Sequence, residues 1–313
     1  MFSAVVFAYS EVGHRCLQVL LDHGVRVPLV FTHEDQPGEQ RWFASVADLA
    51  AARGVRAVTP AQPAAPEWLE QIRRLAPDYL LAGYYRSMLP PQLLALAGRG
   101  ALNMHGSLLP RYRGRAPVNW AIANGETETG ATLHYMVERP DAGPIVAQEA
   151  VAIGLNDDAL AVSLSVAAAA ARVLQATLPA MASGPPPGRP MDLAAGSYFG
   201  GRKPEDGRIQ PDWPGLRVHA MIRAVAPPFP GAFVQAAGRR VLLASSRLSA
   251  EAARHPHLAP CLYASDGRLF VDCQDAVRLQ IGQVLIDGEA CDGREFQERY
   301  GGEPWRFDFI VRD

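Results

Sequence analysis

Residues 4–9 read Ala-Val-Val-Phe-Ala-Tyr, an apolar run of the kind that forms a buried strand. The run leads directly into residues 12–23, whose apolar side chains recur at helical spacing. Because neighbouring parallel strands need a crossover connection that is usually a helix, this pattern predicts the first unit of a parallel sheet.

The same alternation continues beyond this first unit. Further strand-like runs lie at residues 28–32, 79–82 and 101–104, and further helical patterns lie at residues 42–53 and 66–75. The rhythm predicts an α/β domain, with a Rossmann-like, doubly wound, mostly parallel sheet covered by helices on both faces.

The rhythm changes after Gly125. Residues 131–137 and 145–151 are strand-like, and the proline and glycine residues of the segment 138–144 between them favour a turn. We therefore expect an antiparallel hairpin with Asp141 on its loop.

The C-terminal part of the chain predicts a second, smaller domain. An alanine-rich helix at residues 157–182 ends in the proline-rich connector 183–190. A helical segment at residues 216–224 and short strand-like runs at residues 232–236, 240–244, 268–272 and 276–281 follow it. Runs of this length favour a small β-barrel or sandwich. The predicted division is a catalytic domain at residues 1–203 and an OB-like β-barrel at residues 204–313.

Composition excludes several classes of protein. The 313 residues are 49% hydrophobic and 20% charged, which excludes a disordered or fibrous chain. The formal net charge of -2 and the mixed charges argue against a nucleic-acid partner. The apolar segment 159–181 is broken by polar residues, and no basic flank precedes the first strand, so we expect no membrane insertion and a cytoplasmic protein. The four cysteines have no CxxC spacing and no flanking His pairs, which argues against zinc and against a disulfide framework, and we expect no metal.

The turn after the first strand tests for a dinucleotide cofactor. Residues 8–14 contain one glycine, Gly13, and the acidic Glu11, so the GxGxxG fingerprint is absent. The sequence gives no support for NAD.

Residues 103–117 hold the densest group of chemically useful side chains. Asn103 and His105 stand two apart at a strand end, so both emerge on one face at the carboxyl edge, where open α/β sheets bind ligands. An amide N–H can hold an oxyanion and an imidazole can move a proton near neutral pH. A strand-end histidine held by backbone hydrogen bonds is the purely structural alternative.

Other side chains near the same edge suggest ligand contacts. Arg111, Arg113 and Arg115 alternate in a loop closed by prolines and could grip a carboxylate or phosphate, or form a solvated basic loop. Tyr84 and Tyr85 end the preceding strand, where they could stack on a flat ring or pack against the sheet.

With these motifs the chain resembles the folate-dependent formyltransferases, which include methionyl-tRNA formyltransferase and nucleotide-sugar N-formyltransferases. The resemblance covers nearly the whole chain and is carried by Asn103-x-His105, the following residues 107–117, Asp141 and the segment 222–233. It implies a 10-formyltetrahydrofolate-dependent N-formyltransferase, a one-carbon transferase.

Within that family the chain is most similar to the formyltransferase part of the bifunctional enzyme that acts on UDP-4-amino-4-deoxy-L-arabinose. The similar segments are residues 6–9, 31–33, 37–39, 84–86 and 124–130. The resemblance implies a place in lipid A modification and polymyxin resistance. The decarboxylase module of those relatives is absent from the sequence, so we expect formyl transfer alone, with a homo-oligomer or a separate decarboxylase partner left open.

The resemblance also assigns roles to residues. It implies that Asn103 stabilises the transition state, that His105 donates or shuttles a proton, and that Asp141 favours the protonated imidazole. The implied folate contacts are Ser87, Met88, Leu89, Arg115, Val137, Glu138, Arg139, Pro140 and Asp141.

Other functions remain alternatives to a nucleotide-sugar acceptor. Methionyl-tRNA is the first, although acidic residues scattered through the C-terminal half disfavour a long polyanion. A formyltransferase for another nucleotide amino sugar, a deformylase that hydrolyses the folate and a protein that only binds are the others.

Overall fold

The computed structural model describes residues 2–35, 41–301 and 303–308. Contacts divide the chain into two compact units. The first comprises Met1–Pro117, Glu128–Ala152 and Ser163–Gly200, and the second comprises Val118–Thr127, Ile153–Val162 and Gly201–Asp313. The domain division after residue 203 stays a prediction.

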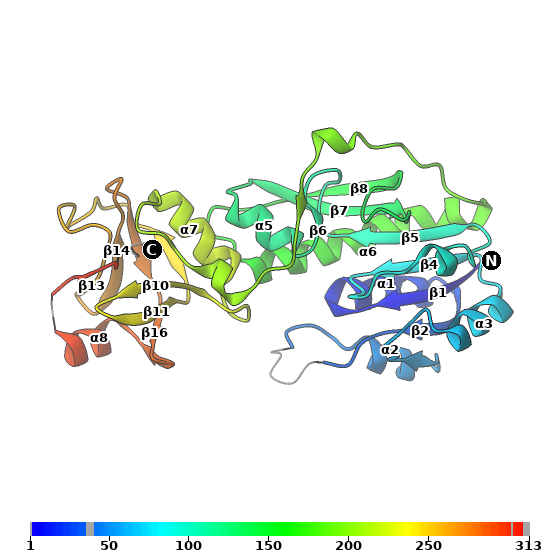
Figure 1. Cartoon of the computed structure of the whole chain (residues 1–313), viewed down its shortest axis with the longest axis horizontal. Coiled ribbons are helices and arrows are strands. Elements are labelled where there is room, and N and C mark those ends of the chain that lie inside the picture. The colour runs from blue at the N-terminus through cyan, green and yellow to red at the C-terminus, as the bar shows by residue number, and fades with distance from the viewer. Residues whose placement is uncertain (1, 36–40, 302, 309–313) are drawn as a thin grey trace. The chain divides into compact units, whose positions relative to one another are not determined.

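A seven-stranded sheet with the order β3-β2-β1-β4-β5-β7-β8 forms the centre of the first unit (Figure 1). Its strands are β1 (Ser3–Ala8), β2 (Arg26–Phe31), β3 (Ala57–Val58), β4 (Tyr79–Gly83), β5 (Gly100–His105), β7 (Glu128–Tyr135) and β8 (Ile145–Ala152). The strands from β3 to β5 pair in parallel, whereas β7 is antiparallel to both β5 and β8. The mostly parallel sheet and the antiparallel hairpin are confirmed.

Most helices of the first unit lie where the sequence predicts them, but the short helix α4 was not predicted. The helices are α1 (Ser10–Asp22), α2 (Val46–Ala52), α3 (Pro66–Leu75), α4 (Pro91–Leu94) and α6 (Ala159–Ser183), of which α6 begins in the second unit and lies in the first from Ser163 on. The helix α2 begins at Val46 rather than at residue 42, because the Ser45 hydroxyl accepts the Asp48 N–H at 3.1 Å and caps the helix there. The predicted bounds of α3 are correct, and its first residue is Pro66, which suits that position.

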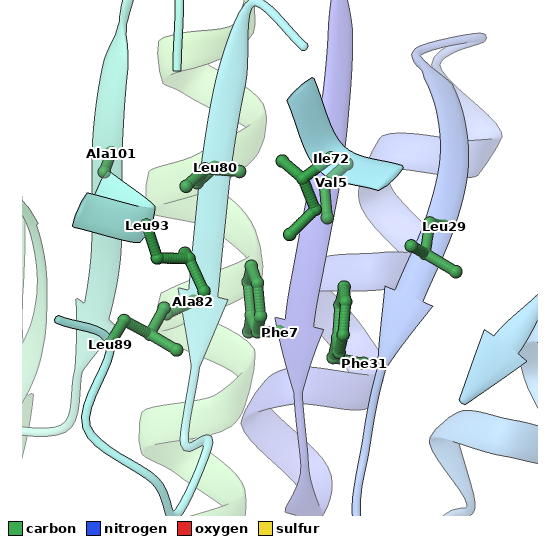
Figure 2. Close-up of a cluster of buried hydrophobic side chains, with 10 residues drawn as sticks. All are labelled: Val5, Phe7, Leu29, Phe31, Ile72, Leu80, Ala82, Leu89, Leu93 and Ala101. Atoms are coloured by element: carbon green, nitrogen blue, oxygen red, sulfur yellow. The ribbon is translucent and has the colours of Figure 1, made fainter. Parts of the chain in front are cut away.

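Aromatic and aliphatic side chains from β1, β2, β4 and β5 pack on one face of this sheet (Figure 2). The rings of Phe7 and Phe31 stack at 4.5 Å across β1 and β2. Ile72 of α3 and Leu93 of α4 belong to the same cluster. Because successive side chains of a strand point to opposite faces, the strand residues between these members face the other side of the sheet.

Helix α6 lies against the other face of the sheet, where Figure 2 shows it as the pale green helix behind the strands that carry the labelled side chains. By length and composition alone it could cross a membrane. Val166, Ala170 and Leu174 are fully buried at a spacing of four, and the Tyr79 hydroxyl donates to the Met181 carbonyl at 3.0 Å. These contacts match the predicted core helix.

The second unit contains two antiparallel sheets with the orders β10-β11-β16-β17 and β12-β15-β14-β13-β18. Their strands are β10 (Ala232–Ala236), β11 (Arg239–Leu243), β12 (Ser246–Leu248), β13 (Cys261–Ser265), β14 (Arg268–Asp272), β15 (Arg278–Ile281), β16 (Val284–Ile286), β17 (Glu289–Cys291) and β18 (Trp305–Arg306). The helices are α5 (Pro117–Ala123), α7 (Gly215–Ala224) and α8 (Gly293–Tyr300). The expected C-terminal antiparallel β domain is confirmed.

All four cysteines are free and buried. Burial raises the pKa of the Cys16 thiol to about 12, and burial with the nearby Asp275 and Asp272 raises that of Cys273 to about 12. Across the described residues no group of His, Cys, Asp and Glu side chains has the arrangement of a metal site.

Candidate active site

The antiparallel pairing of β5 with β7 sets the geometry of the site. Asn103 lies opposite His134, and His105 lies opposite Thr132. Because directly paired residues share a face of the sheet, all four side chains emerge on the same side. The strand ends thus bring an amide, a hydroxyl and two imidazoles together.

His134 holds the amide of Asn103. Its Nδ1 faces the Tyr135 carbonyl oxygen at 2.8 Å, which places a proton on Nδ1. In the neutral ring Nε2 is then an acceptor, and the Asn103 Nδ2 donates to it at 3.1 Å. His134 is 1% exposed, so this contact is shielded from water.

His105 is buried and held at both ring nitrogens. Its Nε2 donates to the Tyr112 carbonyl oxygen at 2.8 Å, so the proton on Nε2 is committed to the backbone. Its Nδ1 lies 3.6 Å from Asp141 Oδ1. Nδ1 is therefore the nitrogen that can exchange a proton beside the carboxylate.

Asp141 connects the other members of the site. Its Oδ1 accepts the second Asn103 amide proton at 3.4 Å and lies 3.5 Å from His134 Nε2, and its Oδ2 accepts the Gly114 N–H at 2.9 Å. Burial by itself would raise the pKa of Asp141, but the neighbouring His105 and the Gly114 N–H act against it, and the pKa is held well below its usual range. The carboxylate stays ionised in the buried site.

The backbone of Asp141 is in the left-handed region, at a φ of 49°. Non-glycine residues adopt that region at a cost of order 1 to 2 kcal/mol. The hydrogen bond from Gly114 and the start of the loop, where the Met136 N–H donates to the Ala101 carbonyl at 2.8 Å, hold the turn in place. The predicted hairpin loop therefore delivers Asp141 to the strand ends in one defined position.

A short pair of strands fixes the loop that contacts His105 and Asp141. The strand β6 (Arg113–Gly114) pairs in parallel with β9 (Tyr198–Phe199), and the rings of Tyr112 and Phe199 stack at 5.1 Å. The Tyr112 N–H donates to the Ser197 hydroxyl at 2.8 Å. Because the Tyr112 carbonyl and the Gly114 N–H both bind the site, this pairing sets their positions.

The three alternating arginines lie in different environments. Arg113 is buried and donates to the Leu193 carbonyl oxygen at 3.4 Å, Arg111 lies over the Tyr112 ring at 5.9 Å, and Arg115 is exposed. The expectation of three guanidinium groups gripping one anion is not met, because the pairing of β6 with β9 carries Arg113 into the interior.

Tyr84 and Tyr85 take two separate places. The Tyr84 hydroxyl lies against the α-carbon of Gly106, the residue after His105, where a β-carbon would collide with it. Tyr85 stacks on the His33 ring at 4.2 Å. Tyr84 therefore borders the carboxyl end of β5, whereas Tyr85 packs toward β2.

The two segments with implied folate contacts, residues 87–89 and 137–141, adjoin the apolar cluster of the first unit that Figure 2 shows. Leu89 is a buried member of it, and Met136, which precedes the second segment, packs against it. The side chains of Met88 and Val137 are exposed by 63% and 42%. Both segments therefore offer apolar surface and backbone groups beside the core, and the contacts to folate stay a prediction.

Sequence reasoning missed His134 and Ser197. His134 lies within the predicted strand 131–137, and its role depends on the register of β7 against β5. Ser197 acts through a pairing with residues far away in the sequence. Pairing the predicted strand 131–137 with the strand of Asn103, so that the hairpin loop brings Asp141 to the strand end, would have placed His134 beside Asn103. No local sequence pattern marks Ser197.

Comparison with known proteins identifies the family. The "Formyl transferase" family model matches residues 5–178, and the model "Formyl transferase, C-terminal domain" matches residues 202–301. The chain belongs to the formyltransferase family, and it is an enzyme of that class.

Solved structures share the fold at low identity. The sugar 3N-formyl transferase WlaRD, crystallised with dTDP and 5-N-formyl-THF, has a TM-score of 0.71 and 17% identity over 90% of this chain and 97% of its own. An N-formyltransferase from Helicobacter canadensis, with folinic acid and dTDP-3-aminofucose, has a TM-score of 0.71 and 17% identity over 90% and 99%. HypX from Aquifex aeolicus, with tetrahydrofolic acid, has a TM-score of 0.64 and 17% identity over 95% and 47%.

One of the segments that carried the finer resemblance, residues 37–39, lies outside the described residues. The others fall on elements of both units.

Proposed function

We propose that the protein transfers the formyl group of 10-formyltetrahydrofolate to the amine of a nucleotide-linked amino sugar. The observation that supports this most is the meeting of Asn103 and His105 at Asp141, whose Oδ1 lies 3.4 Å from Asn103 Nδ2 and 3.6 Å from His105 Nδ1. A donor amide, a proton-exchanging ring and a fixed carboxylate are the groups that acyl transfer between two nitrogens requires.

The acceptor amine attacks the formyl carbon, and a new C–N bond forms as the carbonyl electrons move to oxygen. Asn103 donates an N–H to that oxyanion. The Asn103 amide donates to Asp141 at 3.4 Å and to His134 at 3.1 Å. The N–H that faces Asp141 makes the longer contact, so this is the N–H for which the oxyanion competes.

The tetrahedral intermediate collapses when the bond from carbon to folate N10 breaks. Overall the acceptor amine loses one proton and N10 gains one. His105 Nδ1 carries that proton, because Nε2 is occupied by the Tyr112 carbonyl, and Asp141 at 3.6 Å stabilises the imidazolium between the two steps.

The folate is proposed to lie along Ser87, Met88, Leu89 and the loop Val137, Glu138, Arg139, Pro140 and Asp141, with Arg115 at its side. The adjoining apolar cluster and the exposed Met88 and Val137 support this placement. Extended backbone in such a segment supplies the N–H and C=O groups that a pterin edge pairs with. Folate ligands in the crystals of WlaRD and of the Helicobacter canadensis enzyme support a folate co-substrate.

The acceptor is proposed to be UDP-4-amino-4-deoxy-L-arabinose, which places the enzyme in lipid A modification, polymyxin resistance and the cytoplasm. The motifs of the sequence support this sugar. The dTDP and dTDP-sugar ligands of two structural neighbours support the wider class of nucleotide sugars.

The test offers 10-formyltetrahydrofolate together with UDP-4-amino-4-deoxy-L-arabinose, dTDP-amino sugars or methionyl-tRNA in parallel reactions. Mass spectrometry detects the N-formyl product. We expect formylated UDP-amino sugar. Formylation of methionyl-tRNA alone would contradict the proposal, and release of formate without any acceptor would identify a deformylase.

A further inference from the structure

A cavity of about 300 Å³ lies at the carboxyl ends of β2, β3 and β4. Residues 33–34, 59–61 and 86–87 line it, and all belong to the first unit. In open α/β sheets ligands bind at this edge, near the strand where the order of winding reverses. Here that reversal lies at β1, which pairs with both β2 and β4.

Contacts hold several of the residues that line the cavity in defined positions. His33 stacks on Tyr85 at 4.2 Å, and its Nε2 accepts the Arg86 N–H at 3.1 Å. The Arg86 guanidinium lies 4.3 Å from the centre of the Tyr9 ring. One wall therefore carries a stacked cation and an imidazole, which suit a polar ring and an adjoining phosphate.

A carboxylate also lines the cavity. Glu34 is exposed and its Oε1 accepts the Thr59 hydroxyl proton at 3.2 Å, which fixes the orientation of the side chain. Glu34 follows the second strand of the sheet. In dinucleotide-binding folds an acidic residue in that place hydrogen-bonds the 2′-hydroxyl of a ribose. The second oxygen of Glu34 has no partner among the residues that the structure describes.

The separation from the catalytic strand fits a nucleotide sugar. In the sheet order, β4 and β1 lie between β5 and β2. At about 4.8 Å for each strand spacing, Glu34 after β2 and Thr59 after β3 lie roughly 14 to 19 Å from Asn103 and His105, whereas Arg86 and Ser87 follow β4, the neighbour of β5. In a nucleotide sugar two phosphates and a sugar ring separate the reacting amine from the ribose.

We infer that this cavity binds the nucleoside part of the acceptor, and that Glu34 selects a ribonucleotide over a 2′-deoxyribonucleotide. The inference rests on the proposed function, because it assumes a nucleotide-linked acceptor. The glutamate tail of the folate is the competing occupant, and its carboxylates would be repelled by Glu34.

Calorimetric titration with UDP and with 2′-deoxy-UDP tests the inference without any formyl transfer. A charge-assisted hydrogen bond contributes about 1.5 to 3 kcal/mol, so we expect the wild-type protein to bind UDP at least about tenfold more tightly than 2′-deoxy-UDP. Glu34→Gln should weaken UDP binding about tenfold and remove most of that preference. Ala61→Trp, which fills the cavity, should weaken the binding of both nucleotides.

Glu67→Gln, an exposed glutamate on α3, is the matched control and should bind both nucleotides as the wild type does. Unchanged UDP affinity in Glu34→Gln and Ala61→Trp, with weakened binding of 5-formyltetrahydrofolate, would overturn the inference and assign the cavity to folate. Equal affinity of the wild type for the two nucleotides would also overturn it. Selective UDP binding without any formylated sugar would contradict only the proposed function.

Discussion

At the scale of single residues, the proposed chemistry divides between Asn103 and His105. Removing a proton-transfer group costs about 10² to 10⁴ in turnover, and removing an oxyanion donor costs about 10² to 10³. We expect His105→Ala and Asn103→Ala each to lower kcat within these ranges while the circular dichroism spectrum stays unchanged.

Formyl-product formation in a steady-state assay measures these losses. The exposed His23 at the end of α1 provides a control, and His23→Ala should retain full turnover. Near-normal turnover in either site variant would reject the role assigned to that residue.

The low pKa of Asp141 predicts a pH dependence of stability. A carboxylate whose pKa is lower in the folded than in the unfolded protein stabilises the fold above its ordinary pKa, and this stabilisation is lost as pH falls below that value. We expect Asp141→Asn to lower the free energy of unfolding by about 1.5 to 3 kcal/mol at pH 7.

The difference between wild type and variant should stay constant down to about pH 4, the ordinary pKa of aspartate, and shrink below it. Urea unfolding curves at a series of pH values measure that difference. A difference that grew on acidification would contradict the lowered pKa.

How far the sequence predicts the site also depends on the residue. Asn103 and His105 could be placed on one face because the alternation of a strand is fixed by backbone geometry. Asp141 could be placed on a loop by its proline and glycine neighbours. The contact between His134 and Asn103 depends on strand register, which no single-strand pattern specifies.

Among the elements, the pairing of β6 with β9 positions the loop that contacts the site. Gly114 has a φ of 97°, and a β-carbon there would collide with the Phe199 carbonyl oxygen. We expect Gly114→Ala to displace the N–H that binds Asp141 and to lower kcat by about tenfold or more, since misplacement of about 1 Å can cost 10²-fold.

Gly54→Ala separates this effect from backbone strain, because Gly54 has a φ of 66° with open space around its α-carbon. Thermal melting should show a loss of about 1 to 2 kcal/mol in that variant, with kcat unchanged. Equal turnover in the two variants would show that β9 does not position the loop.

The fold was predictable where elements are long or sharply bounded. The bounds of α3 follow from Pro66, and β10 and β14 lie where their apolar runs predicted them. The strands β12, β16 and β17 each have three residues, too few for a period to be visible. The strands β6 and β9 exist only because two distant segments meet.

For the whole molecule, the formal net charge of -2 predicts a weak dependence on salt. A protein that makes six to ten phosphate contacts to a nucleic acid loses about 10³ to 10⁵ in affinity between 50 and 200 mM salt. We expect kcat/KM for the UDP-amino sugar to change by less than about tenfold over that range. A steeper loss in the steady-state assay would contradict this expectation.

The burial of Cys16, Cys261, Cys273 and Cys291 has a practical consequence. Thiol reagents attack the thiolate, and burial raises the pKa of each of these groups. The native enzyme should resist maleimides and mild oxidants without any cysteine being replaced. A single cysteine engineered on the surface would then accept a fluorophore selectively, so ligand binding could be followed by fluorescence in an otherwise unaltered chain.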